Sequence, residues 1–207
     1  MSAHRLVIGT TNLKKGRELQ ELLAPYGFTV QTLSEARQPI LDVVEDGDTF
    51  AHNARKKAAE QARYLGAWVM ADDSGLAVDA LDGRPGVYSA RYAGESATDA
   101  DNNAKLLAEL GDLPLAKRTA HYVCHVAVAD PRGEIRTECA DICRGRIVFE
   151  PAGTNGFGYD PLFEVVEYHQ TFGQLGPLVK AAISHRARAL RGVVPKLLAL
   201  KASGAWD

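Results

Sequence analysis

The sequence has few cysteines, no long apolar run and no basic excess, and each absence excludes a class of protein. Its three cysteines, Cys124, Cys139 and Cys143, cannot all pair and match no zinc-ligand spacing, which favours free thiols in a reducing compartment. No apolar stretch approaches the length of a membrane span, and no signal-peptide pattern precedes the first apolar segment. We therefore expect a cytoplasmic protein without a membrane partner.

The balance of charges excludes a further class. The chain of 207 residues carries 24 Lys and Arg against 26 Asp and Glu, a formal net charge of −2. Domains that hold long nucleic acids usually have a clear basic excess, so we expect no polymeric nucleic acid as a partner. A small anionic ligand needs only a local cluster of cations, which this composition allows. The length suits one domain, or one domain with two lobes around a cleft.

The most unusual stretch is 71–92, which begins with the acidic segment 72–75 (Asp-Asp-Ser-Gly). The apolar run 68–71 before it indicates a buried strand. We interpret the acidic pair as lying at the end of that strand, on a bend that Gly75 permits. Carboxylates placed in this way suit a divalent cation or general-base chemistry. Taken alone, however, these four residues are explained slightly better by a polar turn.

The N-terminal segment has the pattern of a strand, a polar turn and a helix. Residues 5–9 are apolar and 10–12 are polar, and a helical pattern follows. The free N–H groups and positive dipole at such a helix start form an anion site, to which Lys14 and Lys15 add charge. An ordinary capped helix with solvated lysines is the simpler alternative.

A second candidate carboxylate, Glu45, lies in an acidic turn before a helix that we predict to start near Thr49 with Asp48 as its cap. An acidic turn usually serves only the helix N-terminus. Because Glu45 lies just outside that need, it is a candidate metal ligand. Asn53 and Lys57 are one helical turn apart and can meet the same partner.

The segment 118–129 is apolar in its middle and predicts a central strand. Two further strands are expected at 135–140 and 142–149. His121 and His125 lie on one face of the central strand and could form a metal pair. Because no third ligand is near, hydrogen-bonded or packed histidines are the better interpretation.

Residues 150–163 predict a long loop with three glycines, in which Phe157 and Tyr159 are aromatic side chains on which a planar ring could stack. Loops of this length are more often functional than filler, although a structural loop with buried aromatic residues is the alternative. Two helices are also predicted. Nothing in the helix at 98–110 indicates chemistry, and a last, basic helix runs from about Leu178 to Lys201 with an interruption at Pro195.

Taken together, these patterns favour an enzyme that acts on a nucleotide. Candidate metal carboxylates (Glu45, Asp72 and Asp73), a phosphate site with lysines and a loop for stacking a base are what such an enzyme requires. The sequence contains neither G-x-x-x-x-G-K-[ST] nor G-x-G-x-x-G. The residues alone predict a metal-dependent enzyme with a small phosphorylated substrate.

Six motifs, which cover nearly the whole chain in order, resemble the inosine triphosphate pyrophosphatase family. Its bacterial members are the Ham1-like or RdgB-like pyrophosphatases of deaminated purine nucleotides. The motifs are Thr10-Thr11-Asn12 with Lys15 and Glu18, Thr49-Phe50 with Asn53 and Lys57, Ala71–Gly75, Pro85–Tyr92, Gly156–Pro161, and Lys180 with Ala182–Arg186.

The resemblance implies hydrolysis of ITP, dITP and XTP to the monophosphate and pyrophosphate, which removes deaminated purines from the nucleotide pool. It also implies Mg²⁺ as cofactor and a homodimer. The implied fold is α/β, with an elongated mixed β-sheet flanked by helices and two lobes around a central cleft, formed by one domain over residues 1–207.

By position, the resemblance makes Asp73 the catalytic carboxylate and, with Glu45, a metal ligand. Two positions depart from the family pattern, because His52 stands where a Glu is usual and Asn155 where a second glycine is common. The implied substrate-binding residues are Thr10, Thr11, Asn12, Leu13, Lys14, Lys15, Asn53, Lys57, Ser74, Phe157, Gly158, Tyr159, Asp160, Lys180, His185 and Arg186.

On this hypothesis Asp73 orients or deprotonates a water that attacks the α-phosphorus, and Lys180, Arg186 or a backbone N–H donates to the oxygen at C6 of the base. Two alternatives stay open. One is a Maf-like nucleotide pyrophosphatase with another base preference. The other is a non-catalytic nucleotide sensor, against which the presence of both Glu45 and Asp73 argues.

Overall fold

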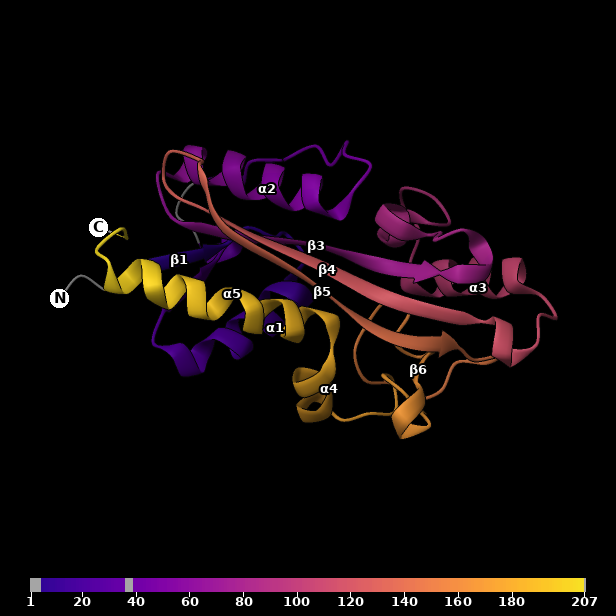
Figure 1. Cartoon of the computed structure of the whole chain (residues 1–207). Coiled ribbons are helices and arrows are strands. Elements are labelled where there is room, and N and C mark those ends of the chain that lie inside the picture. Colours follow the sequence, from indigo (N-terminus) through magenta and orange to yellow (C-terminus); the bar gives the residue numbers. More distant parts are fainter. Residues whose placement is uncertain (1–4, 36–38, 207) are drawn as a thin grey trace. The chain divides into compact units, whose positions relative to one another are not determined.

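The computed structural model describes residues 5–35 and 39–206 and has a mixed α/β architecture (Figure 1). Its sheet has the strand order β2-β1-β3-β4-β5-β6-β7. β1 pairs in parallel with β2 and β3, whereas β6 pairs antiparallel with β5 and β7. The predicted α/β class with a mixed sheet is therefore confirmed. The strands are β1 (Arg5–Ile8), β2 (Thr29–Thr32), β3 (Val69–Val78), β4 (Thr119–Ala129), β5 (Ile135–Ile147), β6 (Phe163–Val165) and β7 (Gln170–Thr171).

Five α-helices accompany the strands in the described residues: α1 (Leu13–Leu23), α2 (Phe50–Leu65), α3 (Asp99–Leu110), α4 (Pro177–Ile183) and α5 (His185–Ala202). The chain divides into two compact units. The first comprises Met1–Asp73, Cys124–Asp141 and Arg186–Asp207, and the second comprises Ser74–Val123 and Ile142–His185. Each unit has a hydrophobic core of its own.

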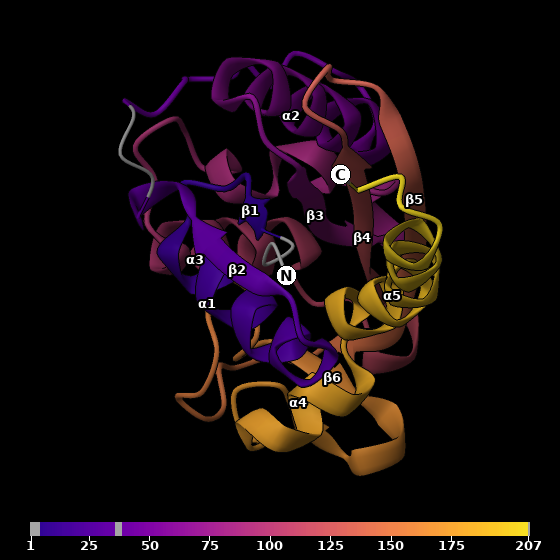
Figure 2. The same ribbon diagram turned by 90° about the vertical axis from the view of Figure 1, so that its left-hand side faces the viewer.

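In the first unit, alternation along the strands creates two cores. Ile8 and Met70 pack with Leu19 of α1 and with residues of α5. Val7, the neighbour of Ile8, faces the opposite way and packs with Ala58 of α2. Successive side chains of a strand point to opposite faces, so α2 covers one face and α1 with α5 the other (Figures 1 and 2). This division determines where the polar residues of β3 point.

The helix starts show which side chains cap them. The Asn12 side chain accepts the N–H groups of Lys14 and Lys15 at the start of α1. Thr49 caps α2 by accepting the N–H of His52 at 3.2 Å. The predicted cap Asp48 was therefore wrong by one residue, because Thr49 has the extended backbone that a cap requires.

Three predicted boundaries were also wrong. β3 runs from Val69 to Val78, so the acidic pair lies within the strand and not on a bend after it. β5 is one continuous strand where two were expected. The last helix is broken at Ser184, whose backbone is extended, and Pro195 lies inside α5. Burial of its apolar neighbours, Val193 and Val194 among them, offsets the backbone hydrogen bond that Pro195 removes.

In the second unit, α3 and an aromatic cluster form the core. Thr98 and Asp101 form a reciprocal capping box at the start of α3, which confirms the predicted helix. The rings of Phe163 and Phe172 are stacked with centroids 5.4 Å apart, and Tyr122 lies 4.7 Å from Phe163. These contacts hold β4, β6 and the segment after β7 together.

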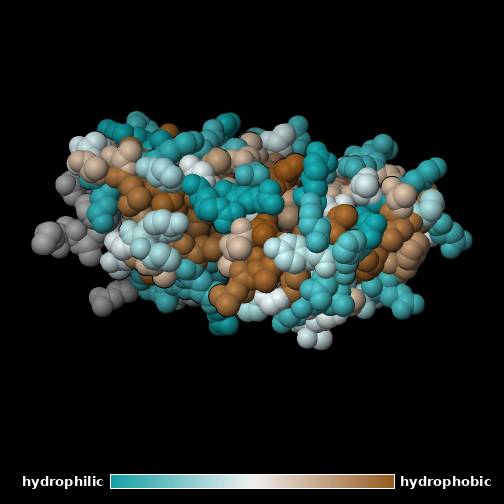
Figure 3. All heavy atoms as spheres, turned by 60° about the horizontal axis from the view of Figure 1, so that its bottom comes forward, coloured by the Kyte–Doolittle hydropathy of each residue, from teal (hydrophilic) through white to brown (hydrophobic). Residues whose placement is uncertain are grey.

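On the face that Figure 3 shows, apolar side chains form several patches between polar ones. Among the described residues, Leu178, Leu13 and Val44 are the most exposed of the large apolar side chains, at 86%, 72% and 65%. None of the helices within residues 5–35 and 39–206 combines the length and apolar character that crossing a bilayer requires.

Candidate active site

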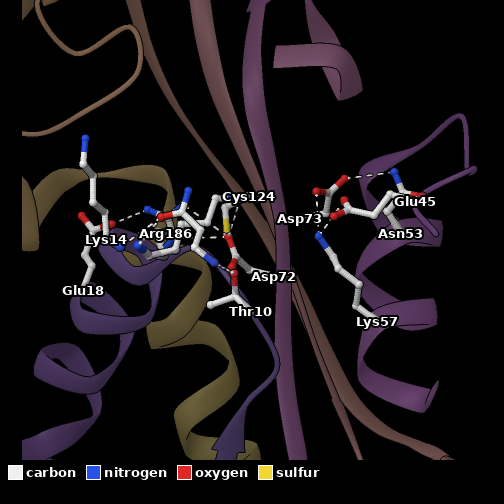
Figure 4. A network of polar contacts seen from close by, with 12 residues as sticks. Thr10, Lys14, Glu18, Glu45, Asn53, Lys57, Asp72, Asp73, Cys124 and Arg186 are labelled. Carbon is white, nitrogen blue, oxygen red and sulfur yellow. Dashed lines mark hydrogen bonds and ion pairs between the residues drawn. The ribbon is translucent and has the colours of Figure 1, made fainter. Parts of the chain in front are cut away.

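The two adjacent carboxylates of β3 point to opposite faces of the sheet. Asp72 has the same parity along the strand as Met70, so it faces α1 and α5. Asp73 has the parity of Val69 and Ala71, so it faces α2. Figure 4 shows the two side chains on opposite sides of β3, each in its own set of polar contacts. The two carboxylates are adjacent in sequence, but their side chains lie on opposite faces of the sheet.

Asp73 lies in a network with one ammonium group. Lys57 Nζ donates to Asp73 Oδ1 at 3.0 Å and to Glu45 Oε2 at 2.8 Å. Asn53 Nδ2 donates to the other oxygen of Asp73 at 3.2 Å. Asp73 is 6% exposed. The structure thus brings together four residues that were predicted from separate segments, and both carboxylates converge on one cation.

Asn53 also holds the turn that carries Glu45. Its Oδ1 accepts the N–H of Gly47 at 2.9 Å, and its Nδ2 lies 3.3 Å from the Gly47 carbonyl oxygen. A Cβ at Gly47 would lie 2.6 Å from Asn53 Oδ1, so only glycine allows this approach. Asn53 therefore connects the turn to Asp73 through one buried side chain.

Burial and Lys57 set the protonation of these groups. Burial raises the pKa of Asp73 above its usual value, and Lys57 and Lys15 only partly oppose this. Burial also acts to raise the pKa of Glu45, but the charge and hydrogen bond of Lys57 lower it overall. For Lys57, burial is outweighed by Asp73 and Glu45, which raise its pKa and keep it charged.

Glu45 and Asp73 are the candidate ligands for Mg²⁺. No group of three or more His, Cys, Asp or Glu side chains in residues 5–35 and 39–206 could hold a metal ion. Mg²⁺ is, however, usually bound by one or two carboxylates together with substrate phosphates and water. Glu45 and Asp73 supply two carboxylates that already share the cation Lys57. The residues fit a Mg²⁺ that the substrate helps to bind.

Asp72 takes part in a buried ion pair. Arg186 places Nε and Nη2 each 3.3 Å from Asp72 Oδ2, and its Nη1 contacts Glu18. Lys15 Nζ lies 3.7 Å from the same Asp72 oxygen. Burial acts to lower the pKa of Arg186, but Asp72 and Glu18 raise it overall. Arg186 is 1% exposed, and its guanidinium already has two carboxylate partners. This arrangement does not favour the predicted contact of Arg186 with a base, which stays a prediction.

The start of α1 is partly occupied by its own cap. Asn12 Oδ1 accepts the N–H groups of Lys14 and Lys15 at 3.0 and 3.1 Å, and Thr10 Oγ1 accepts that of Asn12 at 3.2 Å. Thr11 and Leu13 are exposed. A phosphate here must displace the Asn12 side chain or bind through the lysine side chains.

In the second unit, Asp160 organises the glycine and aromatic loop. It is 2% exposed, and its Oδ2 accepts from Lys180 Nζ at 2.7 Å and from the N–H of Phe157 at 2.8 Å. Lys180 Nζ lies 4.6 Å from the centroid of the Phe157 ring. Tyr122 donates its hydroxyl to Asp160 Oδ1 at 3.3 Å. Asp160 therefore positions two predicted binding residues.

The aromatic rings of the second unit differ in how accessible they are to a ligand. The ring of His185 is stacked on Tyr122, with centroids 4.6 Å apart and an angle of 12°. Tyr159 is 3% exposed and donates its hydroxyl to the Ser89 carbonyl at 2.8 Å. Phe157 is half-buried, which makes it better suited than Tyr159 to stack on a ligand.

Comparison with known proteins identifies the family. The model of the Ham1 family matches residues 6–196. The chain belongs to the Ham1 family. A Rhodopirellula baltica protein named dITP/XTP pyrophosphatase is 55% identical over 195 residues, which cover 94% of this chain and 93% of that protein. A protein of the same name from Desulforamulus reducens is 51% identical over 90% of this chain and 92% of its own length.

Solved structures agree with this assignment. The Ham1 protein from Coxiella burnetii has a TM-score of 0.84 at 38% identity, covering 94% of this chain and 98% of its own. The Staphylococcus aureus Ham1 protein has a TM-score of 0.82 at the same identity and coverage. The resemblance inferred from sequence motifs is confirmed as family membership.

Within this Ham1 family chain, some predicted residues lie in the networks and others do not. Ser74 follows Asp73 on β3 and is half-buried. The histidines of β4 have separate carboxylate partners: His121 Nδ1 lies 3.7 Å from Asp79, and His125 Nε2 lies 2.9 Å from Glu138. They are hydrogen-bonded or paired histidines, as expected.

Sequence reasoning missed Tyr122, which touches both Asp160 and His185. Its partner Asp160 is 38 residues away along the chain. The burial pattern of a central strand predicts an apolar position there, and no local signal indicates that the hydroxyl has a use.

Proposed function

We propose that the chain is a pyrophosphatase that hydrolyses dITP, XTP and ITP to the nucleoside monophosphate and pyrophosphate, and so removes deaminated purine nucleotides. The observation that supports this most directly is the 55% identity, over 94% of the chain, to a protein named dITP/XTP pyrophosphatase. The network of Glu45, Lys57 and Asp73 agrees with this activity, because it supplies the acidic and basic groups that hydrolysis of a phosphoanhydride needs.

Asp73 is the proposed general base. Its raised pKa brings the carboxylate closer to the proton affinity that suits removal of a proton from water. Asn53 holds one of its oxygens and Lys57 the other, so the carboxylate is fixed before substrate arrives. In this role Asp73 orients a water for attack on the α-phosphorus.

Glu45 and Asp73 would together hold Mg²⁺. When bound, the ion supplies neutralisation of the triphosphate and polarisation of its oxygens. Lys57 and Lys15 add positive charge for the leaving pyrophosphate. The distances between Lys57 and both carboxylates are those of charge-assisted hydrogen bonds, so Lys57 also keeps the two ligands together without metal.

The residues of the second unit would bind the base. Lys180 is a donor only, with one of its N–H groups directed to Asp160. Hypoxanthine and xanthine carry an acceptor oxygen at C6, whereas adenine carries an amine there. A buried donor that adenine leaves unpaired rejects that base. Phe157 offers a half-buried ring for stacking.

A substrate panel tests the proposal. Pyrophosphate release with Mg²⁺ is measured for dITP, XTP, ITP, dATP and dGTP, with and without a chelator. We expect turnover of the first three, loss of turnover with chelator and recovery with added Mg²⁺. The same assay is made on Asp73→Asn, which should lose turnover. Its control is Asp48→Asn, which changes an exposed carboxylate of the acidic turn outside the network of Glu45, Lys57 and Asp73. Absence of pyrophosphate release from all three deaminated substrates would refute the proposal.

The homodimer, the single two-lobed domain and the cytoplasmic location are proposed on the same family grounds. The molar mass in solution, measured by light scattering, tests the dimer.

A further inference from the structure

Helix α3 contacts the glycine and aromatic loop through two side chains. Asp99 Oδ2 accepts the N–H of Gly158 at 2.9 Å, and Asn103 Nδ2 donates to the Gly158 carbonyl at 3.1 Å. Residues four apart on a helix lie on one face, which allows both side chains to reach the backbone of the same residue. Both backbone groups of Gly158 are therefore held by α3.

These contacts add to those on Phe157. The N–H of Phe157 donates to Asp160 at 2.8 Å. Gly156 and Gly158 have φ values of +77° and +62°, in the left-handed region that favours glycine. A Cβ at Gly156 would overlap the Asp160 carboxylate. The backbone on both sides of the Phe157 ring is thus fixed by side chains from outside the loop's tip.

The helix does not need either residue for its own start. Thr98 and Asp101 already form the capping box, and Leu106 and Leu110 are buried at 0% and 1% exposure. The neighbouring Asn102 bonds the segment before the helix, at the N–H of residue 93 and the carbonyl of residue 90. The capping box and the buried leucines of α3 thus come from other residues than Asp99 and Asn103, although the charge of Asp99 in the first turn also favours the helix dipole.

We propose that Asp99 and Asn103 are positioning residues that hold the Phe157 ring in place for stacking on the purine base. This rests on the proposed function, since it assigns Phe157 to the base. Fixing a loop before binding reduces the ordering cost that the ligand must offset. The effect falls on affinity for the base-containing substrate and leaves the reaction at the α-phosphorus unchanged.

Near-isosteric variants separate the two contacts from the helix. Asn103→Asp replaces the donor by an acceptor that faces the Gly158 carbonyl, and Asp99→Ala removes the acceptor. Asp99→Asn keeps an oxygen that can accept and serves as the conservative rescue. Asp101→Asn alters the same helical turn without touching Gly158, and is the matched control.

The kinetic constants for dITP give the first readout. Two lost hydrogen bonds, each worth a few-fold, predict a KM raised about tenfold in the double variant Asp99→Ala/Asn103→Asp, with kcat within about twofold. Asp99→Asn should remain near the unsubstituted protein. Asp101→Asn should lower stability and leave KM unchanged. A double variant whose KM equals that of Asp101→Asn would overturn the proposal.

Hydrogen–deuterium exchange separates this proposal from the proposed function. The Gly158 amide donates to Asp99, so Asp99→Ala should speed exchange in the segment 155–161, whereas Asp101→Asn should not. If the unsubstituted chain releases no pyrophosphate from dITP, the proposed function fails, and the exchange result still decides whether α3 holds the loop. Unchanged exchange in Asp99→Ala would overturn the positioning role, whatever the activity.

Discussion

The opposite orientation of two adjacent carboxylates predicts that the same substitution has different effects at neighbouring positions. Asp72→Asn should reduce stability with a smaller loss of turnover, and Asp73→Asn should remove turnover with little loss of stability. Both changes remove one negative charge and keep the size of the side chain. Any difference between them therefore reports the environment on each face of β3.

The cost of Asp72→Asn follows from its burial and its partner. The side chain is 0% exposed and pairs with Arg186, whose side chain is 2% exposed. Removing one partner of a buried pair usually costs 3–5 kcal/mol. Because Arg186 keeps Glu18 as a second carboxylate, we expect the lower end, about 3 kcal/mol. For a chain of this size that lowers the melting temperature by about 6–12 °C.

The effect of Asp73→Asn follows from its proposed chemistry. Burial raises the pKa of Asp73, so ionising this carboxyl costs more free energy here than it does in water. A neutral amide removes that cost and loses one hydrogen bond with Lys57, which retains Glu45. We expect a change in unfolding free energy within about 1 kcal/mol. Loss of the general base and metal ligand should lower kcat by about 10²–10³-fold or more.

The two variants are compared by thermal unfolding and by pyrophosphate release from dITP, at a temperature well below both melting transitions. Asp48→Asn controls for the loss of an acidic side chain on the surface. If Asp72→Asn lost turnover as completely as Asp73→Asn and unfolded at the unsubstituted temperature, the two carboxylates would share one role. The division by face would then be wrong.

Three further predictions concern other contacts. Lys57→Met should lower kcat by at least about 10²-fold, since it removes the cation between both proposed metal ligands, and added Mg²⁺ should recover part of the activity. Arg55 lowers the pKa of Glu138 from 4.5 to about 2 in the folded protein. The ionised Glu138 therefore stabilises the folded state fully above pH 4.5, and this stabilisation is lost as the pH falls towards 2. Glu138→Gln should flatten the decline of the urea midpoint in that window, and an unchanged slope would contradict this. Gly153→Ala places a Cβ against the Gly173 carbonyl at φ +80°, so we expect a loss of more than about 1 kcal/mol in urea unfolding, where an equal midpoint would refute the clash.

Local patterns predicted the elements whose cause is local. Helix α3 was found because Thr98 supplies a cap and the apolar period continues to Leu110. The first strand and the following helix were likewise visible, since each depends on residues within a few positions. Family resemblance then supplied the roles of Asp73 and Glu45. Local spacing had left a simpler explanation for each, a polar turn at Asp73 and the start of the following helix near Glu45.

What could not be predicted depends on contacts between distant segments. The continuation of β3 through Asp72 and Asp73 needs buried cations for both carboxylates, and Arg186 comes from 114 positions away along the chain. The contact of Asp99 with Gly158 joins residues 59 apart. The helix dipole is enough to explain an aspartate in the first turn of a helix. The sequence therefore gives no signal that Asp99 also accepts a hydrogen bond from Gly158.

The parity of β3 also constrains how this site can be altered. Because the side-chain period of a strand is two, inserting one residue before Val69 would move every following side chain of β3 to the opposite face, and would so exchange the faces of the two carboxylates. Asp72 would then face Lys57, and Asp73 would face Arg186. Both faces would still pair a carboxylate with a cation, but Met70 and Ala71 would also exchange places between the core of α1 with α5 and that of α2. The small side chains on the α2 face, 0% exposed at Ala54, leave no room for a methionine. Packing on the apolar half of β3 therefore fixes which carboxylate can do the chemistry on its polar half.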